Sequence, residues 1–297
     1  RRDDLLAAGD GAGLAHEVGQ DVELGRREVD RGAVDGDLVT VDVQGERADG
    51  PQIPGPLGRA RGGRTGRRRR LLNGVPASLR QALRDLAADT DGIDTAIYAT
   101  YDRDPLEPII GLGDADAPLC FFGRDPGREE VRHGEPFIGA GGQIVRRVLY
   151  RHLNGAEMPD FEAGRALGRH YFWINTVPYK PIGNKAWSMA VKRRFQPLMR
   201  QLLIDSWHGR HIVTLGREAF LWFAIDQPRE ARQRLEAFWQ REDRFTASLD
   251  IDLQDAQGHA RTFTLHPLPH PSPLNQTWFK RFPALLEARL RQLDASR

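Results

Sequence analysis

PLCFFGRDPG, residues 118–127, is the stretch that decides the fold of this chain. Its first half is a short apolar run, which is typical of a buried strand in a parallel sheet. Its second half contains glycines and a proline, which favour a turn. Ligands of open α/β sheets bind at the carboxyl ends of the strands, where this turn lies. Asp125, inside the turn, is therefore a candidate functional residue.

Strand-like and helical patterns alternate along the rest of the chain. Three further apolar runs are predicted strands: YFWINTV (171–177), HIVTLG (211–216) and RTFTLHPL (261–268). Strands separated by helices imply parallel βαβ units with right-handed crossovers. We therefore predict an α/β fold, a three-layer α/β/α sandwich with a central four-stranded mainly parallel sheet.

Apolar side chains recur at helical spacing between the predicted strands. The predicted helices are ASLRQALRDLAAD (77–89) with Ser78 as its cap, GGQIVRRVLYRHL (141–153), SMAVKRRFQPLMRQLLIDSW (188–207), two segments near 218–225 and 228–240, and a last helix over about 278–293. Pro197 lies inside the third of these helices, so we expect a kink there.

Composition changes near residue 70. Residues 1–70 contain no Phe, Trp, Tyr, Met, Cys or Lys, and a segment without large side chains cannot fill a core. We therefore predict a disordered N-terminal extension over 1–70 and a single α/β/α domain over 71–297. The run RGGRTGRRRR (61–70) is either a nucleic-acid arm or a solvated run of charge, and the solvated run is the more common case.

Composition also limits the class of protein. Cys120 is the only cysteine, so it cannot form an internal disulfide and cannot by itself hold zinc or an iron–sulfur cluster. No apolar run is long enough to cross a membrane, and the chain does not begin with the pattern of a secretory signal. We expect a cytoplasmic protein with no membrane partner. The net charge of +2 is too small to indicate a nucleic-acid partner by itself.

GRDPGREEVRHGEPFIGAGGQIV, residues 123–145, is the first candidate motif. Gly123, Pro126 and Gly127 favour a turn in which backbone N–H groups can face a ligand, and the carboxylate of Asp125 could orient a water molecule there. Phe137 follows in a polar, glycine-rich loop, where an aromatic ring can stack on a base. The alternatives are that Asp125 caps the turn and that Phe137 is simply buried.

INTVPYKPIGNKAW, residues 174–187, is the second motif. The amide of Asn175 ends a strand and can donate and accept hydrogen bonds at once, as reading the edge of a pyrimidine requires; a turn-forming asparagine is the alternative. Lys180 and Lys185 follow in a Pro/Gly loop. All four lysines of the chain lie near the motifs, the other two being Lys192 and Lys280, which suits contacts to phosphates.

HPSPLN, residues 270–275, is the third motif. His270 can donate a hydrogen bond to an oxyanion, and the Pro-Ser-Pro run around Ser272 is a rigid, extended backbone that could press on DNA. Leu274 projects from a loop, where an apolar side chain could enter a base stack. The alternatives are a surface histidine and a leucine that anchors the loop to the last helix.

These three motifs, in this order, resemble those of the uracil-DNA glycosylase superfamily over about residues 118–290. GRDPG is similar to the first motif of the typical bacterial branch, which has aspartate at the position of Asp125. HPSPLN is similar to the leucine-bearing intercalation loop of that branch. The block through Phe137, and NTVPYKPIGN, look more like the iron–sulfur-containing branch found in thermophiles.

The resemblance implies a role for each matching residue. Asp125 would position or activate the attacking water or stabilise the sugar cation, and His270 would stabilise negative charge on the departing uracil. Gly123, Gly127, Phe137 and Asn175 would bind the base, which Phe137 stacks upon and Asn175 reads. Leu274 would fill the gap left in the duplex. The DNA-binding set would be Lys180, Lys185, Ser272, Leu274 and Lys280.

The sequence departs from these relatives at three positions. Tyr179 stands where the iron–sulfur branch has a cysteine, so we infer no cluster, and we predict neither a metal nor another cofactor. Gly127 replaces the tyrosine with which the typical bacterial enzymes exclude thymine, which leaves the substrate range open. Arg124 lies next to Asp125, and its charge could lower the pKa of that carboxyl and hold it ionised.

The prediction is a monofunctional DNA glycosylase of base excision repair that hydrolyses the N-glycosidic bond of uracil in DNA, with other deaminated bases left open. Its partner would be DNA containing uracil or related deaminated bases, and the protein would be a monomer. One alternative is a non-catalytic uracil- or damage-binding DNA protein on the same fold. Another is an RNA- or nucleotide-directed hydrolase, since a fold does not determine a function.

Overall fold

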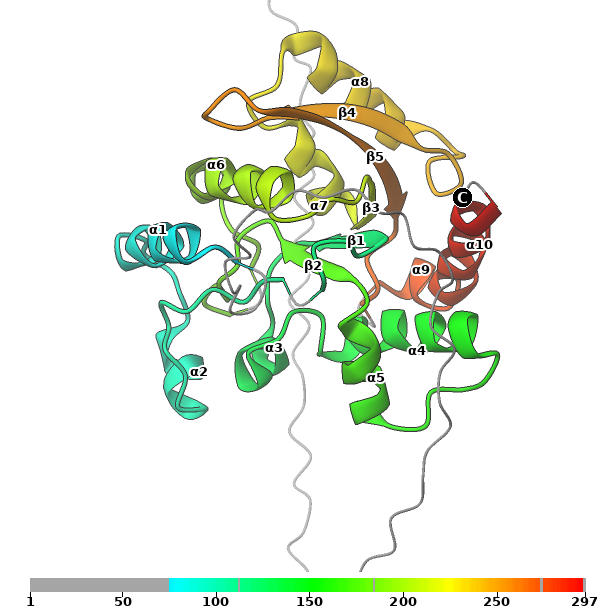
Figure 1. Cartoon of the computed structure of the whole chain (residues 1–297), viewed down its shortest axis with the longest axis horizontal. Coiled ribbons are helices and arrows are strands. Elements are labelled where there is room, and N and C mark those ends of the chain that lie inside the picture. Colours follow the sequence, from blue (N-terminus) through cyan, green and yellow to red (C-terminus); the bar gives the residue numbers. More distant parts are fainter. Residues whose placement is uncertain (1–74, 112, 184, 273–274, 296–297) are drawn as a thin grey trace, which may run out of the picture. The chain divides into compact units, whose positions relative to one another are not determined.

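A computed structural model describes residues 75–111, 113–183, 185–272 and 275–295. Its sheet has five strands in the order β2-β1-β3-β5-β4 (Figure 1). The strands are β1 (Leu119–Gly123), β2 (Phe172–Asn175), β3 (His211–Leu215), β4 (Leu249–Gln254) and β5 (Ala260–Leu268). Strands β2, β1, β3 and β5 are parallel, and β4 pairs with β5 in the antiparallel sense. The predicted α/β architecture is confirmed, with one strand more than predicted.

The additional strand, β4, forms the edge of the sheet. Its sequence LDIDLQ alternates apolar and polar residues, and its burial alternates in the same way, with Ile251 and Leu253 buried. On the exposed face, the hydroxyl groups of Thr262 and Thr264 each donate a 2.6 Å hydrogen bond to an aspartate of β4. A period of two is the signature of a half-buried strand, so the sequence carries the signal for β4.

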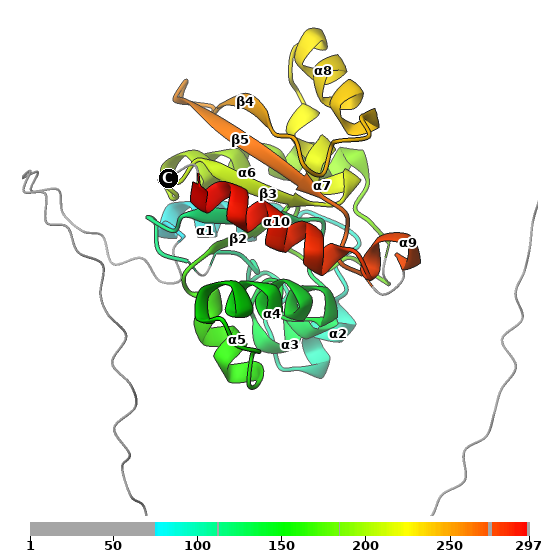
Figure 2. The ribbon, with the colours of Figure 1, turned by 90° about the vertical axis from the view of Figure 1, so that its right-hand side faces the viewer.

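Helices lie on both faces of the sheet (Figure 2). They are α1 (Ala77–Ala88), α2 (Thr95–Thr100), α3 (Arg128–His133), α4 (Ala140–Asn154), α5 (Phe161–Gly168), α6 (Met189–Asp205), α7 (Arg217–Leu221), the 3-10 helix η1 (Trp222–Ala224), α8 (Arg229–Gln240), α9 (Gln276–Phe279) and α10 (Phe282–Ala295). None of the described helices is long and apolar enough to span a membrane.

Two details of the helices differ from the sequence prediction. Ser78 lies inside α1, whose N-cap position is Pro76, so the predicted serine cap is wrong. Helix α6 contains Pro197, as predicted, and its N-cap is Ser188, whose side chain accepts a hydrogen bond from the backbone of Val191. The last predicted helix is two helices, α9 and α10, which part at Lys280.

The sheet separates two apolar cores. Side chains of one face, such as Phe122 and Ile174, pack in a core with α1, α6 and α7. Side chains of the other face, such as Phe121 and Trp173, pack in a core with α4 and α10, which lie side by side in Figure 2. Because both faces are covered, each central strand is apolar on both sides.

The carboxyl ends of the parallel strands meet at one edge of the sheet. Gly123, at the end of β1, is in register with Asn175, at the end of β2. On the other side of β1, the backbone N–H of Gly216 donates to the carbonyl of Leu268, where β5 ends. The loops that carry the three motifs therefore leave the sheet at neighbouring points.

The predicted N-terminal extension, 1–70, lies outside the described residues, and so does Leu274. The prediction of a single domain over 71–297 is likewise left as a prediction.

Candidate active site

A cavity of about 740 Å³ opens where the three motifs leave the sheet. Its wall includes Asp125, Phe137, Asn175 and His270, together with Ser272. These side chains come from three segments that are far apart in the sequence. Gly123, Gly127 and four glycine or alanine residues at 139–142 complete one side, so the backbone itself is accessible there.

Asp125 is almost completely buried, with 3% of its side chain exposed. Its Oδ1 accepts a hydrogen bond from the hydroxyl of Thr176 at 3.2 Å, and Arg124 Nε lies 3.3 Å from Oδ2. Burial raises the pKa of the Asp125 carboxyl to about 6, although the charges of Arg124 and Lys192 act in the opposite direction. Arg124 therefore lowers this pKa as expected, but desolvation outweighs it. The carboxylate is the main form only above about pH 6.

Asn175 is 3% exposed, and its Oδ1 has no hydrogen-bond partner among the described residues. Most buried polar atoms in folded proteins are paired. An unpaired carbonyl oxygen next to a cavity therefore indicates a ligand that donates to it.

His270 lines the same cavity from the HPSPLN segment. Burial, followed by the positive charge of Arg124, lowers the pKa of its imidazole to about 4. At neutral pH the ring is therefore uncharged and can donate one hydrogen bond. Gly216 makes room for it: φ is +94° there, and a Cβ would lie 3.0 Å from the Cβ of His270.

The Phe137 ring covers the end of β1. A Cβ at Gly123 would lie 2.4 Å from Cζ of this ring, so only glycine fits there. The ring also contacts Trp173, with 5.2 Å between centroids. Phe137 has a φ of +55°, which is unusual for a bulky residue.

Glu130 and Thr176 shape the site without having been predicted. The Glu130 carboxylate accepts hydrogen bonds from the N–H groups of Gly127 (2.9 Å), Ile138 (3.0 Å) and Gly139 (2.8 Å), so it ties the GRDPG turn to the Phe137 loop. The Thr176 hydroxyl donates to the Arg124 carbonyl at 2.6 Å. Glutamate three residues after a turn glycine is a capping-box signal that could have pointed to Glu130.

The Phe137 loop also touches the HPSPLN segment. At Gly141, in the first turn of α4, a Cβ would lie 2.7 Å from the carbonyl oxygen of Pro271. The two backbones are thus in direct contact across the mouth of the cavity, and glycine permits this approach.

The predicted DNA-binding residues lie in different surroundings. Lys180 is buried, and its ammonium donates to Asp94 (2.9 Å) and to the carbonyls of Pro181 (2.9 Å) and Gly183 (2.7 Å). All three N–H donors of its ammonium bind acceptors within the protein. Lys180 therefore stabilises this loop and has no donor left for a phosphate. Lys185 and Lys280 are exposed but do not line the cavity, whereas Ser272 does.

The residues present do not fit an iron–sulfur cluster. Tyr179, at the position of a cluster cysteine in the resembling branch, is buried, donates to the carbonyl of Leu106 at 3.1 Å and packs against Phe195. Cys120, the only cysteine of the sequence, is buried in β1, and burial raises its pKa. Such a cluster requires several thiolates.

One group of described side chains has the spacing of a metal site, namely Asp205, Asp255 and His259. The Asp255 carboxylate, however, already accepts hydrogen bonds from Gln257 and from both the backbone and the ring of His259. These bonds belong to the turn between β4 and β5, and Asp205 is the last residue of α6.

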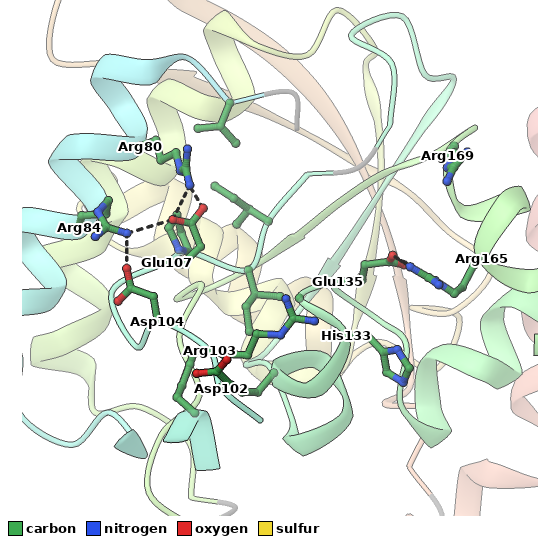
Figure 3. Close-up of a pocket in the computed structure, with 17 residues that line it drawn as sticks. Arg80, Arg84, Asp102, Arg103, Asp104, Glu107, His133, Glu135, Arg165 and Arg169 are labelled. Atoms are coloured by element: carbon green, nitrogen blue, oxygen red, sulfur yellow. Dashed lines mark hydrogen bonds and ion pairs between the residues drawn. The ribbon is translucent and has the colours of Figure 1, made fainter. Parts of the chain in front are cut away.

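A second and larger cavity, of about 880 Å³, contains none of the predicted site residues (Figure 3). Several of its charged side chains form ion pairs: Arg80 pairs with Glu107 at 2.7 Å, and Arg84 pairs with Asp104 at 2.7 Å. This cavity has no comparable set of unpaired buried polar atoms among the described residues.

A model of the uracil DNA glycosylase superfamily matches residues 110–294, which is more than half of the chain. The chain belongs to the uracil DNA glycosylase superfamily. The match contains all three motifs and the whole cavity wall, and it confirms the resemblance at the level of the family. At the level of the family, this superfamily is one of DNA glycosylases that act in DNA repair.

One relative in the superfamily is the type-4 uracil-DNA glycosylase of Archaeoglobus fulgidus. It is 42% identical to this chain over 41 residues, which are 14% of this chain and 21% of the relative. The chain thus aligns with about a fifth of that protein's length.

Proposed function

We propose that this protein is a monofunctional DNA glycosylase that hydrolyses the N-glycosidic bond of uracil in DNA, as a step of base excision repair. One observation carries the proposal: a buried carboxylate, a buried amide with an unpaired oxygen and a half-buried neutral imidazole line the same cavity. Membership of the superfamily supports it.

The reaction develops opposite charges on its two products. The C1′–N1 bond breaks and its electron pair leaves with the base, which gives an oxocarbenium-like sugar and an anionic uracil. The Asp125 carboxylate would stabilise the sugar cation and orient water for attack on C1′, and would accept the proton that this water loses. The neutral imidazole of His270 would donate a hydrogen bond to the developing uracil anion.

Base recognition would take place on the same wall. Extrusion of a base costs a few kcal/mol, which stacking on the Phe137 ring would offset in part. The Asn175 amide would read the Watson–Crick edge, since its unpaired Oδ1 can accept from the N3–H of uracil. Leu274, outside the described residues, keeps its proposed role as the wedge, and Lys185, Ser272 and Lys280 their proposed contacts to the strand.

The proposal is tested on oligonucleotides that contain uracil, hypoxanthine or xanthine, single-stranded and in each pairing context. Release of uracil to leave an abasic site is expected. Asp125→Asn should strongly reduce the rate of release while the affinity for uracil-containing DNA is kept. Tight binding by the unsubstituted protein with no release from any of these substrates would instead identify the non-catalytic binding protein.

A further inference from the structure

Phe137 holds a backbone conformation that its own side chain disfavours. Its φ of +55° is uncommon for a residue with a bulky side chain. Such a conformation persists only where the surrounding structure determines it, and it is concentrated at functional sites. The contacts that fix the backbone of Phe137 are therefore of functional interest.

Arg146, on α4, makes the principal contact with this backbone. Its Nε donates to the Phe137 carbonyl at 2.9 Å, and its Nη2 donates to the Pro136 carbonyl at 3.1 Å. A third bond, of 2.7 Å, joins Nη1 to the carbonyl of Gly164 at α5. The guanidinium thus binds the carbonyl before and the carbonyl after the Phe137 Cα, and it links both to α5 through Gly164.

The Arg146 side chain is enclosed by close contacts on several sides. It is completely buried, and no carboxylate in the described part of the chain forms an ion pair with it. Its guanidinium lies 4.8 Å from the centroid of the Trp173 ring, and a Cβ at Gly168 would lie 2.0 Å from Nη1. Burial lowers its pKa to about 10. Burying a cation is costly, and the charges of Glu135 and Glu130 offset only part of this cost. A purely structural filler at this place would be better apolar.

We propose that Arg146 is a positioning residue for base recognition: it fixes the Pro136 and Phe137 carbonyls so that the Phe137 ring faces the flipped base. Arg146 does not line the cavity, so its effect must pass through Phe137. The proposal rests on the proposed function, because it needs a base in the cavity. The start of the same loop has a second anchor, the ion pair between Glu135 and Arg165 (Figure 3).

The chain contains a matched control, Arg289 on α10. It is also buried, its Nη2 donates to two backbone carbonyls, those of Phe245 (3.0 Å) and Ala247 (2.8 Å), and burial lowers its pKa to about 10 as well. Arg289 does not line the cavity. Arg146→Met and Arg289→Met therefore remove the same chemical group from similar surroundings, and only the first should affect the base.

The experiment compares the affinities of the full-length protein for two duplexes. One carries a 2′-fluorinated deoxyuridine, whose glycosidic bond resists cleavage, and the other carries an abasic analogue at the same position. We expect the unsubstituted protein to prefer the duplex with the base. Arg146→Met and Phe137→Ala should each reduce this preference about tenfold, within the range for stacking of a base on an aromatic ring. Arg146→Lys should give a smaller reduction, and Arg289→Met should leave the preference unchanged.

A double substitution tests whether Arg146 acts through Phe137. Phe137→Ala combined with Arg146→Met should reduce the preference no further than Phe137→Ala alone. Additive losses, equal losses on both duplexes, or the same loss in Arg289→Met would overturn the inference, and so would equal affinity of the unsubstituted protein for the two duplexes. If Arg146→Met does not fold, Arg146→Lys takes its place in these comparisons, with the smaller reduction of the preference as the expected result. A protein that prefers the base and loses this preference in Arg146→Met, but releases no uracil, would disprove the proposed function and keep the inference.

Discussion

The two cavities described above differ in the state of their polar groups more than in their volume. Several charged side chains of the larger one, about 880 Å³, form ion pairs, such as that of Arg80 with Glu107. The smaller one, about 740 Å³, contains a carboxyl with a raised pKa and an amide oxygen without a partner. Paired charges satisfy one another, whereas unpaired buried groups are stabilised only by a ligand. The smaller cavity is therefore the candidate active site.

The strongest test of this comparison removes one carboxylate from each cavity. Asp125→Asn should lower the single-turnover rate of uracil release by about a thousandfold, because general-base and electrostatic contributions of this kind are of that order. Glu107→Gln, in the larger cavity, should change the rate by less than about twofold once folding is confirmed by circular dichroism. Comparable losses in both variants would remove the distinction between the cavities.

The pH dependence of the rate provides a second test. The Asp125 carboxyl has a pKa of about 6 in the folded protein, and its ionised form is the one that can act. The single-turnover rate should therefore fall about tenfold for each unit of pH below 6 and level off above it. His270, with a pKa of about 4, stays neutral over this range. A rate that is constant between pH 5 and pH 8 would contradict the role given to Asp125.

The smallest expected effect is on stability. Asp125 titrates near 3.8 when unfolded and near 6 when folded, so the folded state binds the proton more tightly. The unsubstituted protein should therefore lose up to about 3 kcal/mol of stability as the pH rises from 4 to 6. Asp125→Asn does not titrate and should unfold at a higher temperature than the unsubstituted protein at pH 8, with a smaller difference at pH 4. Thermal melts at the two pH values measure this difference. A variant that is less stable than the unsubstituted protein at pH 8 would contradict the expectation that the ionised Asp125 carboxylate destabilises the folded state.

Much of the fold could be predicted because its central strands are apolar on both faces. Runs such as that of β1 (Leu119–Gly123) stand out from the helical patterns around them. The edge strand β4 alternates apolar residues with two aspartates and a glutamine on its exposed face, so it lacks that contrast. The position of the candidate site followed from the rule that loops at the carboxyl ends of parallel strands gather at one edge.

The energetics of the site could not be read from the sequence. The effect of Arg124 on its neighbour Asp125 is local and visible in the sequence, whereas the larger effect of burial depends on the whole fold. Lys180 lies in a loop typical of phosphate contacts, yet its ammonium is engaged by a tertiary contact to Asp94 and by two carbonyls of its own loop. The link between Arg146 and Phe137 likewise depends on α4 packing against the loop that precedes it.

The close approach of Gly141 to Pro271 couples the two sides of the cavity mechanically. One backbone leads to the Phe137 ring and the other to the His270 imidazole, and a side chain at position 141 would force them apart. The distance between the aromatic ring and the imidazole therefore depends on a glycine that belongs to neither.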